Sequence, residues 1–230
     1  MQKILNLSIL LLVLVSTINL AQDSFRIKLG YGNYYMKSLK RMASNVAGSY
    51  RARGIDAQIV DDFPANFNYQ FQYFPKNSRQ EDFGIFISYK STGARIAYSD
   101  YSGGVKSDFI VSGYSAGGII ELIGPKILSL ETVIYVQPSI IYSTLLLKDE
   151  VIVYGVKASE EASFNTLGGS FEAGIQARID LPGKFSAGFN AGLEFSYSPD
   201  FKLDENSDAY LPNTSPDWMG VRIGMMVRYE

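Results

Sequence analysis

The sequence predicts an all-β protein: a closed, antiparallel, up-and-down β-barrel of about eight strands that spans a membrane, with a short helix in its first long loop. Three observations lead to this fold class. Apolar and polar residues alternate over many stretches, the connections between these stretches alternate between long and short, and aromatic residues lie near the strand ends. Successive side chains of a strand point to opposite faces, so each alternating stretch has one apolar and one polar face.

The first 21 residues have the layout of a secretory signal peptide. Lys3 precedes an apolar run from Ile4 to Ile18, and Ala21 stands directly before Gln22. An uncleaved membrane anchor is the alternative interpretation. In either case we expect export from the cytoplasm, with a signal at 1–21 and a single barrel domain at 22–230.

The composition excludes several classes of function. The chain has no cysteine and no histidine, which removes disulfides, thiol chemistry, the lipid-modified cysteine of lipoproteins, and the commonest general base and metal ligand. Its 21 basic and 23 acidic residues nearly balance, whereas a nucleic-acid partner favours a basic surface. We therefore expect no cofactor, no metal, no nucleic-acid partner and no enzymatic activity.

Period-two alternation locates the strands. In "KFSAGFNAGLEFSYS" at 184–198 every odd position is apolar or aromatic and every even position from Ser186 to Ser196 is small or polar. The same counting gives eight candidate strands, at 25–31, 66–74, 83–90, 108–122, 130–146, 167–179, 184–198 and 218–230. Short apolar runs in 91–107 and 147–165 leave a ten-stranded barrel open.

The connections between these strands differ in length in a regular way. The long ones are 36–65, 91–107, 147–165 and 198–217, and the short ones are 75–82, 123–129 and 180–184. Outer-membrane barrels have this asymmetry, with short periplasmic turns and long extracellular loops. A soluble sandwich has no reason to keep it, so the pattern favours apolar faces that meet lipid.

Two further features support the membrane interpretation. The polar faces of the strands are rich in Gly, Ser, Asn and Gln with single charges, which suits a narrow enclosed interior. Aromatic residues near the strand ends predict interfacial girdles, formed by Tyr31, Tyr34, Tyr35, Tyr73, Phe74, Tyr197, Trp218 and Tyr229. Because the edge of an open sheet leaves backbone groups unpaired in lipid, the ring of strands must close.

The first long connection contains a helical pattern. In "MKSLKRMASNVAGSYRARG" at 36–54, apolar residues recur every three or four positions, and basic residues fall between them. We interpret the segment as a short amphipathic basic helix. It either packs its apolar stripe over the mouth of the barrel or contacts acidic lipid head groups or a partner.

As a whole, this pattern resembles the small eight-stranded outer-membrane barrels of Gram-negative bacteria, the OmpX-like and OmpA transmembrane-domain group. The resemblance covers the mature chain and rests on the signal peptide, the alternating strands, the loop asymmetry and the last strand "VRIGMMVRYE". It implies an outer-membrane location, contact with outer-membrane lipid and lipopolysaccharide, and recognition by the barrel-insertion machinery. In the family the last strand ends in an aromatic residue, whereas here Tyr229 is followed by Glu230.

The inward-facing charges are the first candidate site. If the apolar faces meet lipid, the polar lumen contains Arg26, Lys28, Glu172, Arg178, Glu194, Arg222 and Arg228, with Glu131 less certain. We expect Glu194 to interact with Arg222, since their strands run side by side, and we expect the three other arginines toward the periplasmic end. An eight-stranded barrel has room only for its own side chains, so this network plugs the lumen. A narrow ion path is the alternative.

The segment "STGARIAYSDYSGG" at 91–104 is the second candidate site. Arg95, Asp100 and Tyr101 can bind a sugar or a protein partner, or they can satisfy the loop backbone. Together these features predict a structural role, or surface interaction through the long extracellular loops. One alternative is a subunit of a larger secretion or uptake assembly. Another is a soluble lipocalin-like ligand-binding barrel, although that family has Gly-x-Trp on its first strand and here Trp218 begins the last.

Overall fold

Eight strands form a closed ring. The computed structural model describes residues 23–75, 81–101, 103–127, 130–203 and 211–229, so the predicted signal peptide lies outside it. The ring consists of β1 (Ser24–Tyr34), β3 (Asn66–Phe74), β4 (Glu81–Ser99), β5 (Gly103–Ile127), β6 (Leu130–Val153), β7 (Val156–Asp180), β8 (Phe185–Tyr197) and β10 (Gly220–Tyr229). All neighbours pair antiparallel, and pairing of β1 with β10 closes the ring. The predicted fold class is confirmed, with eight strands in the wall.

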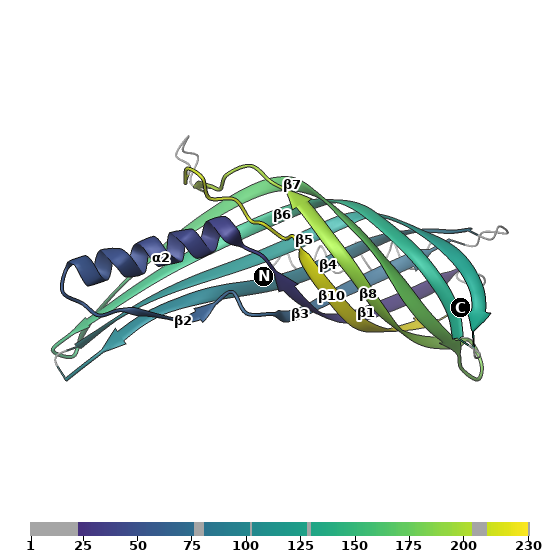
Figure 1. The fold of residues 1–230 in the computed structure, drawn as a ribbon, viewed down its shortest axis with the longest axis horizontal. Helices are drawn as coiled ribbons and strands as arrows, with labels where there is room; N and C mark the ends of the chain where they lie inside the picture. Colours follow the sequence, from purple (N-terminus) through teal and green to yellow (C-terminus); the bar gives the residue numbers. More distant parts are fainter. Residues whose placement is uncertain (1–22, 76–80, 102, 128–129, 204–210, 230) are drawn as a thin grey trace, which may run out of the picture.

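Four of the strands extend well beyond the others. β4 to β7 have 19 to 25 residues, while the remaining wall strands have 9 to 13. The long strands project together at one end of the barrel, here called the mouth, and the opposite end carries the short turns (Figure 1). Two short strands pair with the projecting part: β2 (Gln58–Asp62) with β4, and β9 (Lys202–Leu203) with β7.

The segments 91–107 and 147–165 are therefore not the long loops that the sequence predicts. They continue the strands into two hairpins, β4–β5 and β6–β7. In the second hairpin Val153 pairs with Val156 across the two-residue turn Tyr154–Gly155, in which both φ angles are positive. Such turns match the twist of the strands. Cross-strand ion pairs, including Lys148 with Glu161 at 2.6 Å, accompany the extended ladder.

The outer face of the ring is an apolar band. Leu29, Ile87, Ile175 and Ile223 are among many large apolar side chains that remain exposed on the outside. At the rim of the band near the mouth, exposed Tyr89 and Tyr114 lie opposite one another, and Tyr114 also lies opposite Tyr142.

Part of the predicted aromatic girdle was wrong. Tyr34, Phe74 and Trp218 lie near strand ends, but all three are buried. Tyr34 and Trp218 pack edge to face, with ring centroids 5.0 Å apart. The parity of each strand places these side chains on the inner face, and proximity to a strand end does not reveal this parity.

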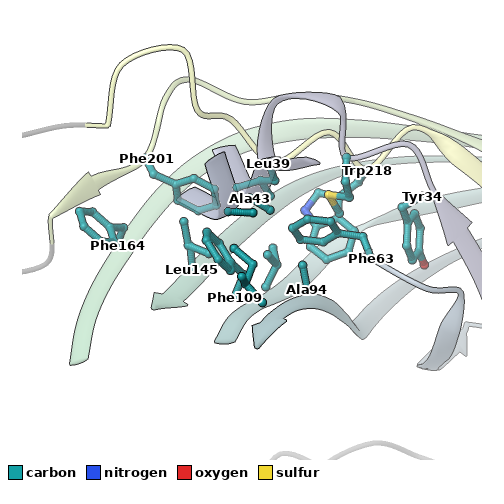
Figure 2. Packing of buried hydrophobic residues seen from close by; sticks show 14 of the residues in the cluster. Tyr34, Leu39, Ala43, Phe63, Ala94, Phe109, Leu145, Phe164, Phe201 and Trp218 are labelled. Atoms are coloured by element: carbon teal, nitrogen blue, oxygen red, sulfur yellow. The ribbon is translucent and has the colours of Figure 1, made fainter. Parts of the chain in front are cut away.

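Helix α2 (Lys37–Ala52) lies over the projecting strands (Figure 1). Leu39, Ala43 and Ala47 are buried in an apolar cluster with inward-facing residues of the long strands, such as Phe109 and Leu145. Figure 2 shows this cluster between the helix and the strands. The apolar stripe of the helix therefore packs over the mouth of the barrel, which is one of the two arrangements that the sequence predicts. The inner face thus changes from polar within the ring to apolar beyond it.

Candidate functional site

The centre of the lumen holds a cluster of four charged side chains from four strands. Arg222 forms a buried ion pair with Glu172, and its Nη1 lies 3.6 Å from Oε2 of Glu194, the contact expected from the sequence. Glu194 is also paired with Lys90. Arg222 Nη2 donates to Oδ1 of Asn68 at 2.7 Å. A buried charge is tolerated when it is paired and hydrogen-bonded, and these contacts supply both conditions.

Aromatic rings cover this cluster on the mouth side. The ammonium group of Lys90 lies 4.8 Å from the ring of Trp218 and 5.5 Å from that of Tyr34, within the range of cation–π attraction. Trp218 is fully buried, and its Nε1 donates to Oγ of Ser143 at 2.9 Å. The polar interior therefore gives way to the apolar cluster under α2 at the level of these rings.

A second cluster lies toward the short-turn end. Arg26 and Glu121 form a fully buried pair with two hydrogen bonds, one of them from Nη2 to Oε2 at 2.9 Å. Arg178 Nε donates to Oε2 of Glu131 at 2.7 Å. The guanidinium of Arg26 also lies 4.5 Å from the centre of the Phe74 ring. Bidentate arginine–carboxylate pairs combine strength with fixed geometry, so the pair of Arg26 and Glu121 links β1 to β5 in a defined orientation.

Between the two clusters lies a layer of amides and one lysine. Gln70 Nε2 donates to Oε1 of Gln137 at 3.0 Å. Lys28 lies 4.2 Å from the ring of Tyr135, whose hydroxyl donates to Oε1 of Glu172 at 2.7 Å. Nζ of Lys28 has no hydrogen-bond partner among the described residues. The ring of Tyr135 and the carboxylates of Glu172 and Glu121 are the groups that attract this buried amine.

The structure brings all seven predicted lumen residues into the interior, where each is buried. Sequence reasoning missed three important members of the network: Lys90, Glu121 and Tyr135. Lys90 lies on the polar face of its stretch, so parity alone could have included it. Glu121 and Tyr135 belong to 108–122 and 130–146, where the two faces differ less in polarity than in the other stretches. Tyr135 has the same parity as Glu131, but an aromatic residue carries no signal of an inward position.

The three residues singled out in 91–104 do not form one site. Arg95 is paired with Asp108 on the neighbouring strand, with 2.6 Å between Nε and Oδ1. Asp100 accepts hydrogen bonds from Tyr98 Oη at 2.8 Å and from the backbone N–H of Gly103 at 3.0 Å, so it stabilises the hairpin turn. Tyr101 is fully exposed.

Among the described residues, no group of three or more Asp and Glu side chains is arranged to hold a metal ion. In the same part of the chain, no helix is both long and apolar enough to cross a membrane.

Taken together, the ring has an apolar outside and a charged, hydrogen-bonded inside. In lipid every backbone group must be paired within the protein, which a closed ring achieves and an open sheet does not. This arrangement is that of a membrane-spanning β-barrel, in which lipid-facing and lumen-facing residues alternate.

Comparison with known proteins gives structural likenesses alone. No protein-family model and no curated protein matches the chain. Among solved structures, Ail of Yersinia pestis is 17% identical with a TM-score of 0.40 and coverage of 90% of this chain and 97% of Ail. Neisserial surface protein A is 9% identical with a TM-score of 0.38, covering 90% and 96%. A major outer membrane protein of Thermus thermophilus is 12% identical with a TM-score of 0.46, covering 90% and 99%. All three TM-scores are below 0.5. The fold class is therefore assigned from the closed ring of strands, with its apolar outer face and polar inner face.

Proposed function

We propose that this protein is an integral outer-membrane β-barrel whose lumen is plugged by its own side chains and whose role is structural or one of surface interaction. One observation carries this proposal: paired charges lie inside the ring and the apolar band lies outside it. The short-turn end would face the periplasm and the mouth the exterior. Outer-membrane lipid, lipopolysaccharide and the barrel-insertion machinery are the partners that this location implies.

The plug has a clear physical basis. Six cationic side chains (Arg26, Lys28, Lys90, Arg178, Arg222 and Arg228) and four glutamates (Glu121, Glu131, Glu172 and Glu194) share the described part of the lumen. Four of the cations form ion pairs with the four glutamates, each pair joining two strands: Arg26, Lys90, Arg178 and Arg222. The apolar cluster under α2 follows at the mouth. A lumen filled in this way favours a closed barrel over a continuous ion path.

The projecting hairpins are the surface best placed for interaction. Their tips expose apolar and aromatic side chains, notably Tyr101, Tyr154 and Val156. Exposed apolar patches mark interaction sites more often than ordinary surface does. This observation also supports the second candidate function, a subunit of a larger secretion or uptake assembly. A lipocalin-like role is disfavoured, because ion pairs occupy the interior where an apolar ligand would bind. We propose no catalytic role, since the chain has no histidine.

The proposal is tested by fractionating cells and running the outer-membrane fraction on a gel, unboiled and boiled. A folded barrel resists cold detergent and changes its apparent mass on heating, so we expect a shift in that fraction. In planar bilayers the purified protein should give no steady conductance. A soluble periplasmic protein without a shift would refute the membrane location, and a stable open channel would refute the plug.

A further inference from the structure

A groove of about 490 Å³ lies on the outside of the barrel near the mouth, where β1, β8 and β10 meet the beginning of α2. Its walls are apolar side chains of the outer band, with Tyr35 exposed at 57%, Leu193 at 51% and Phe195 at 48%. Met219 and Val221 also line the groove, and Lys40 of the helix lines it too. An apolar surface is thus combined with a cation.

The position of the groove corresponds to the edge of the lipid-facing band. Leu193 and Val221 are opposite one another in the β8–β10 ladder. The backbone N–H of Tyr35 donates to the carbonyl of Met219 at 2.8 Å, just before the chain turns into α2. These residues are among the last outward-facing ones before the chain leaves the wall. In a membrane, this level is where the acyl chains of the outer leaflet meet their head groups.

The charge at this end of the groove is positive. Lys40 has one weak ion pair, to Asp62 at 3.9 Å, and the two side chains are 37% and 52% exposed. Lys37 and Arg41 are exposed, and Lys37 precedes Lys40 by three residues and Arg41 by four, so Lys37 neighbours both on the helix surface.

Besides Asp62, two acidic side chains of the described residues lie near the groove, and each has a partner other than the lysines of α2. No acidic residue occurs between Lys37 and Ala52. Asp217 is half-buried, and its Oδ1 accepts a hydrogen bond from the backbone N–H of Met219 at 3.2 Å. Glu194 lines the groove from the wall, but its side chain is buried in the lumen with Lys90.

We propose that this groove binds a phosphate-bearing lipid of the outer leaflet. The acyl chains would lie on Leu193, Phe195 and Val221, and the phosphate would lie against Lys40 and its basic neighbours on α2. This inference rests on the proposed function, because the groove faces lipid only in a membrane-inserted barrel. The proposal names a specific lipid site on a surface that otherwise contacts lipid only in general. In this site the basic side of α2 contacts the head group, while the apolar stripe of α2 packs on the barrel.

The experiment uses the folded full-length mature barrel in detergent micelles, titrated with bis-phosphorylated lipid A and followed by native mass spectrometry. Lipid A from which both phosphates have been removed is the matched ligand. The test variant combines Lys37→Gln with Lys40→Gln. The matched control is Lys148→Gln, at a cation of the β6–β7 hairpin away from the groove.

A lysine near an anionic membrane surface contributes about 1 kcal/mol, and 1.4 kcal/mol corresponds to tenfold in affinity. We therefore expect the double variant to weaken binding by roughly thirtyfold, dephosphorylated lipid to bind correspondingly weakly, and Lys148→Gln to match the wild type. A second variant, Phe195→Ser, should weaken both lipids, since it alters the apolar wall.

Equal affinity for the two lipids, or an unchanged affinity in the double variant, would overturn the site. So would a dimer that blocks the groove and excludes lipid. The heat-dependent gel shift separates the two proposals. If the protein shifts but shows no phosphate-dependent binding, only the lipid site is refuted. If the protein does not shift, the outer-membrane barrel and the lipid site are both refuted.

Discussion

At the scale of single residues, the lumen shows how a charge is kept inside a narrow barrel. Arg222 is shared between two glutamates on neighbouring strands, and Glu194 is shared in turn with Lys90. The partners come from distant parts of the chain, so each pair also holds two sides of the ring together. Removing one partner leaves the others buried with an uncompensated charge, which is more costly than the pair itself is stabilising.

We predict that Arg222→Leu lowers the free energy of unfolding by about 3–5 kcal/mol, because it leaves Glu172 and Glu194 short of a cation. The measurement is urea unfolding of the refolded barrel in lipid vesicles. Arg95→Ala is the control, since its pair with Asp108 is partly exposed and such pairs contribute up to about 1 kcal/mol. Similar losses in the two variants would contradict the structural role of the lumen network.

Asp108 provides a pH test outside the membrane. Burial alone would raise the pKa of its carboxyl group, but hydrogen bonds and charges from Arg95 and Lys106 outweigh burial and hold the pKa below its ordinary value. Because this pKa is lower in the folded hairpin than in the unfolded chain, the stabilisation is present above the unfolded pKa and is lost as pH falls through the folded one.

Arg95→Gln should raise the pKa of the Asp108 carboxyl toward its ordinary value, as measured by the ¹³C shift of that carbon against pH. Lys126→Gln, at the short-turn end of β5 and paired with Asp180, should leave the titration unchanged. A titration of Asp108 that does not respond to loss of Arg95 would show that the pair is not formed in solution.

At the scale of elements, α2 is held by packing and by its ends. Its apolar stripe is buried against β4 to β7, and Oγ of Ser38 in its first turn donates to the carbonyl of Ser215 at 2.6 Å. The helix begins after Met36, which has a positive φ of 46° and gives no side-chain cap. Since a single short helix is marginal in water, α2 depends on the apolar cluster that it covers.

We predict that Leu39→Asp releases α2 while the barrel stays folded, because it places a charge in the buried stripe. Trypsin should then cut within the helix, at Arg41 or Arg51, and the gel shift on heating should remain. Ser44→Asp, on the exposed side, should leave the helix resistant. Loss of the gel shift together with the helix would show instead that the cap and the ring fold as one unit.

At the scale of the whole molecule, the distribution of residues is the reverse of that in a soluble barrel. Large apolar side chains face outward around the ring, and arginine, lysine and glutamate face inward. Beyond the band the distribution returns to that of a soluble domain, because the projecting strands and α2 bury an apolar core between them. The molecule therefore joins a lipid-facing barrel to a small water-facing domain.

A charge on the outer face distinguishes lipid from water directly. Ile223→Arg, within the apolar band, should destabilise the barrel in a bilayer by about 2–4 kcal/mol. Val156→Arg, at the exposed hairpin tip, should have almost no effect. Both are read by urea unfolding in vesicles. If Ile223→Arg were as neutral as Val156→Arg, the band would not face lipid.

The sequence by itself determined the strand pattern, the faces of the clear strands and most of the lumen charges. These follow from period-two alternation, which is local: the polar face of 167–179 contains Glu172 and Arg178 whatever the rest of the chain does. The helix in the first connection is likewise predicted by apolar residues that recur every three or four positions.

Only the tertiary structure decided how far the strands extend, which charges pair and which aromatic residues face inward. Arg26 and Glu121 are 95 positions apart, and their contact depends on the register with which eight strands close into a ring. The projecting parts of β4 to β7 share one apolar core with α2, which brings together residues that are far apart in the chain. Trp218 is buried because the closed ring gives its side chain Ser143 and Lys90 to contact, and no short stretch of sequence contains that information.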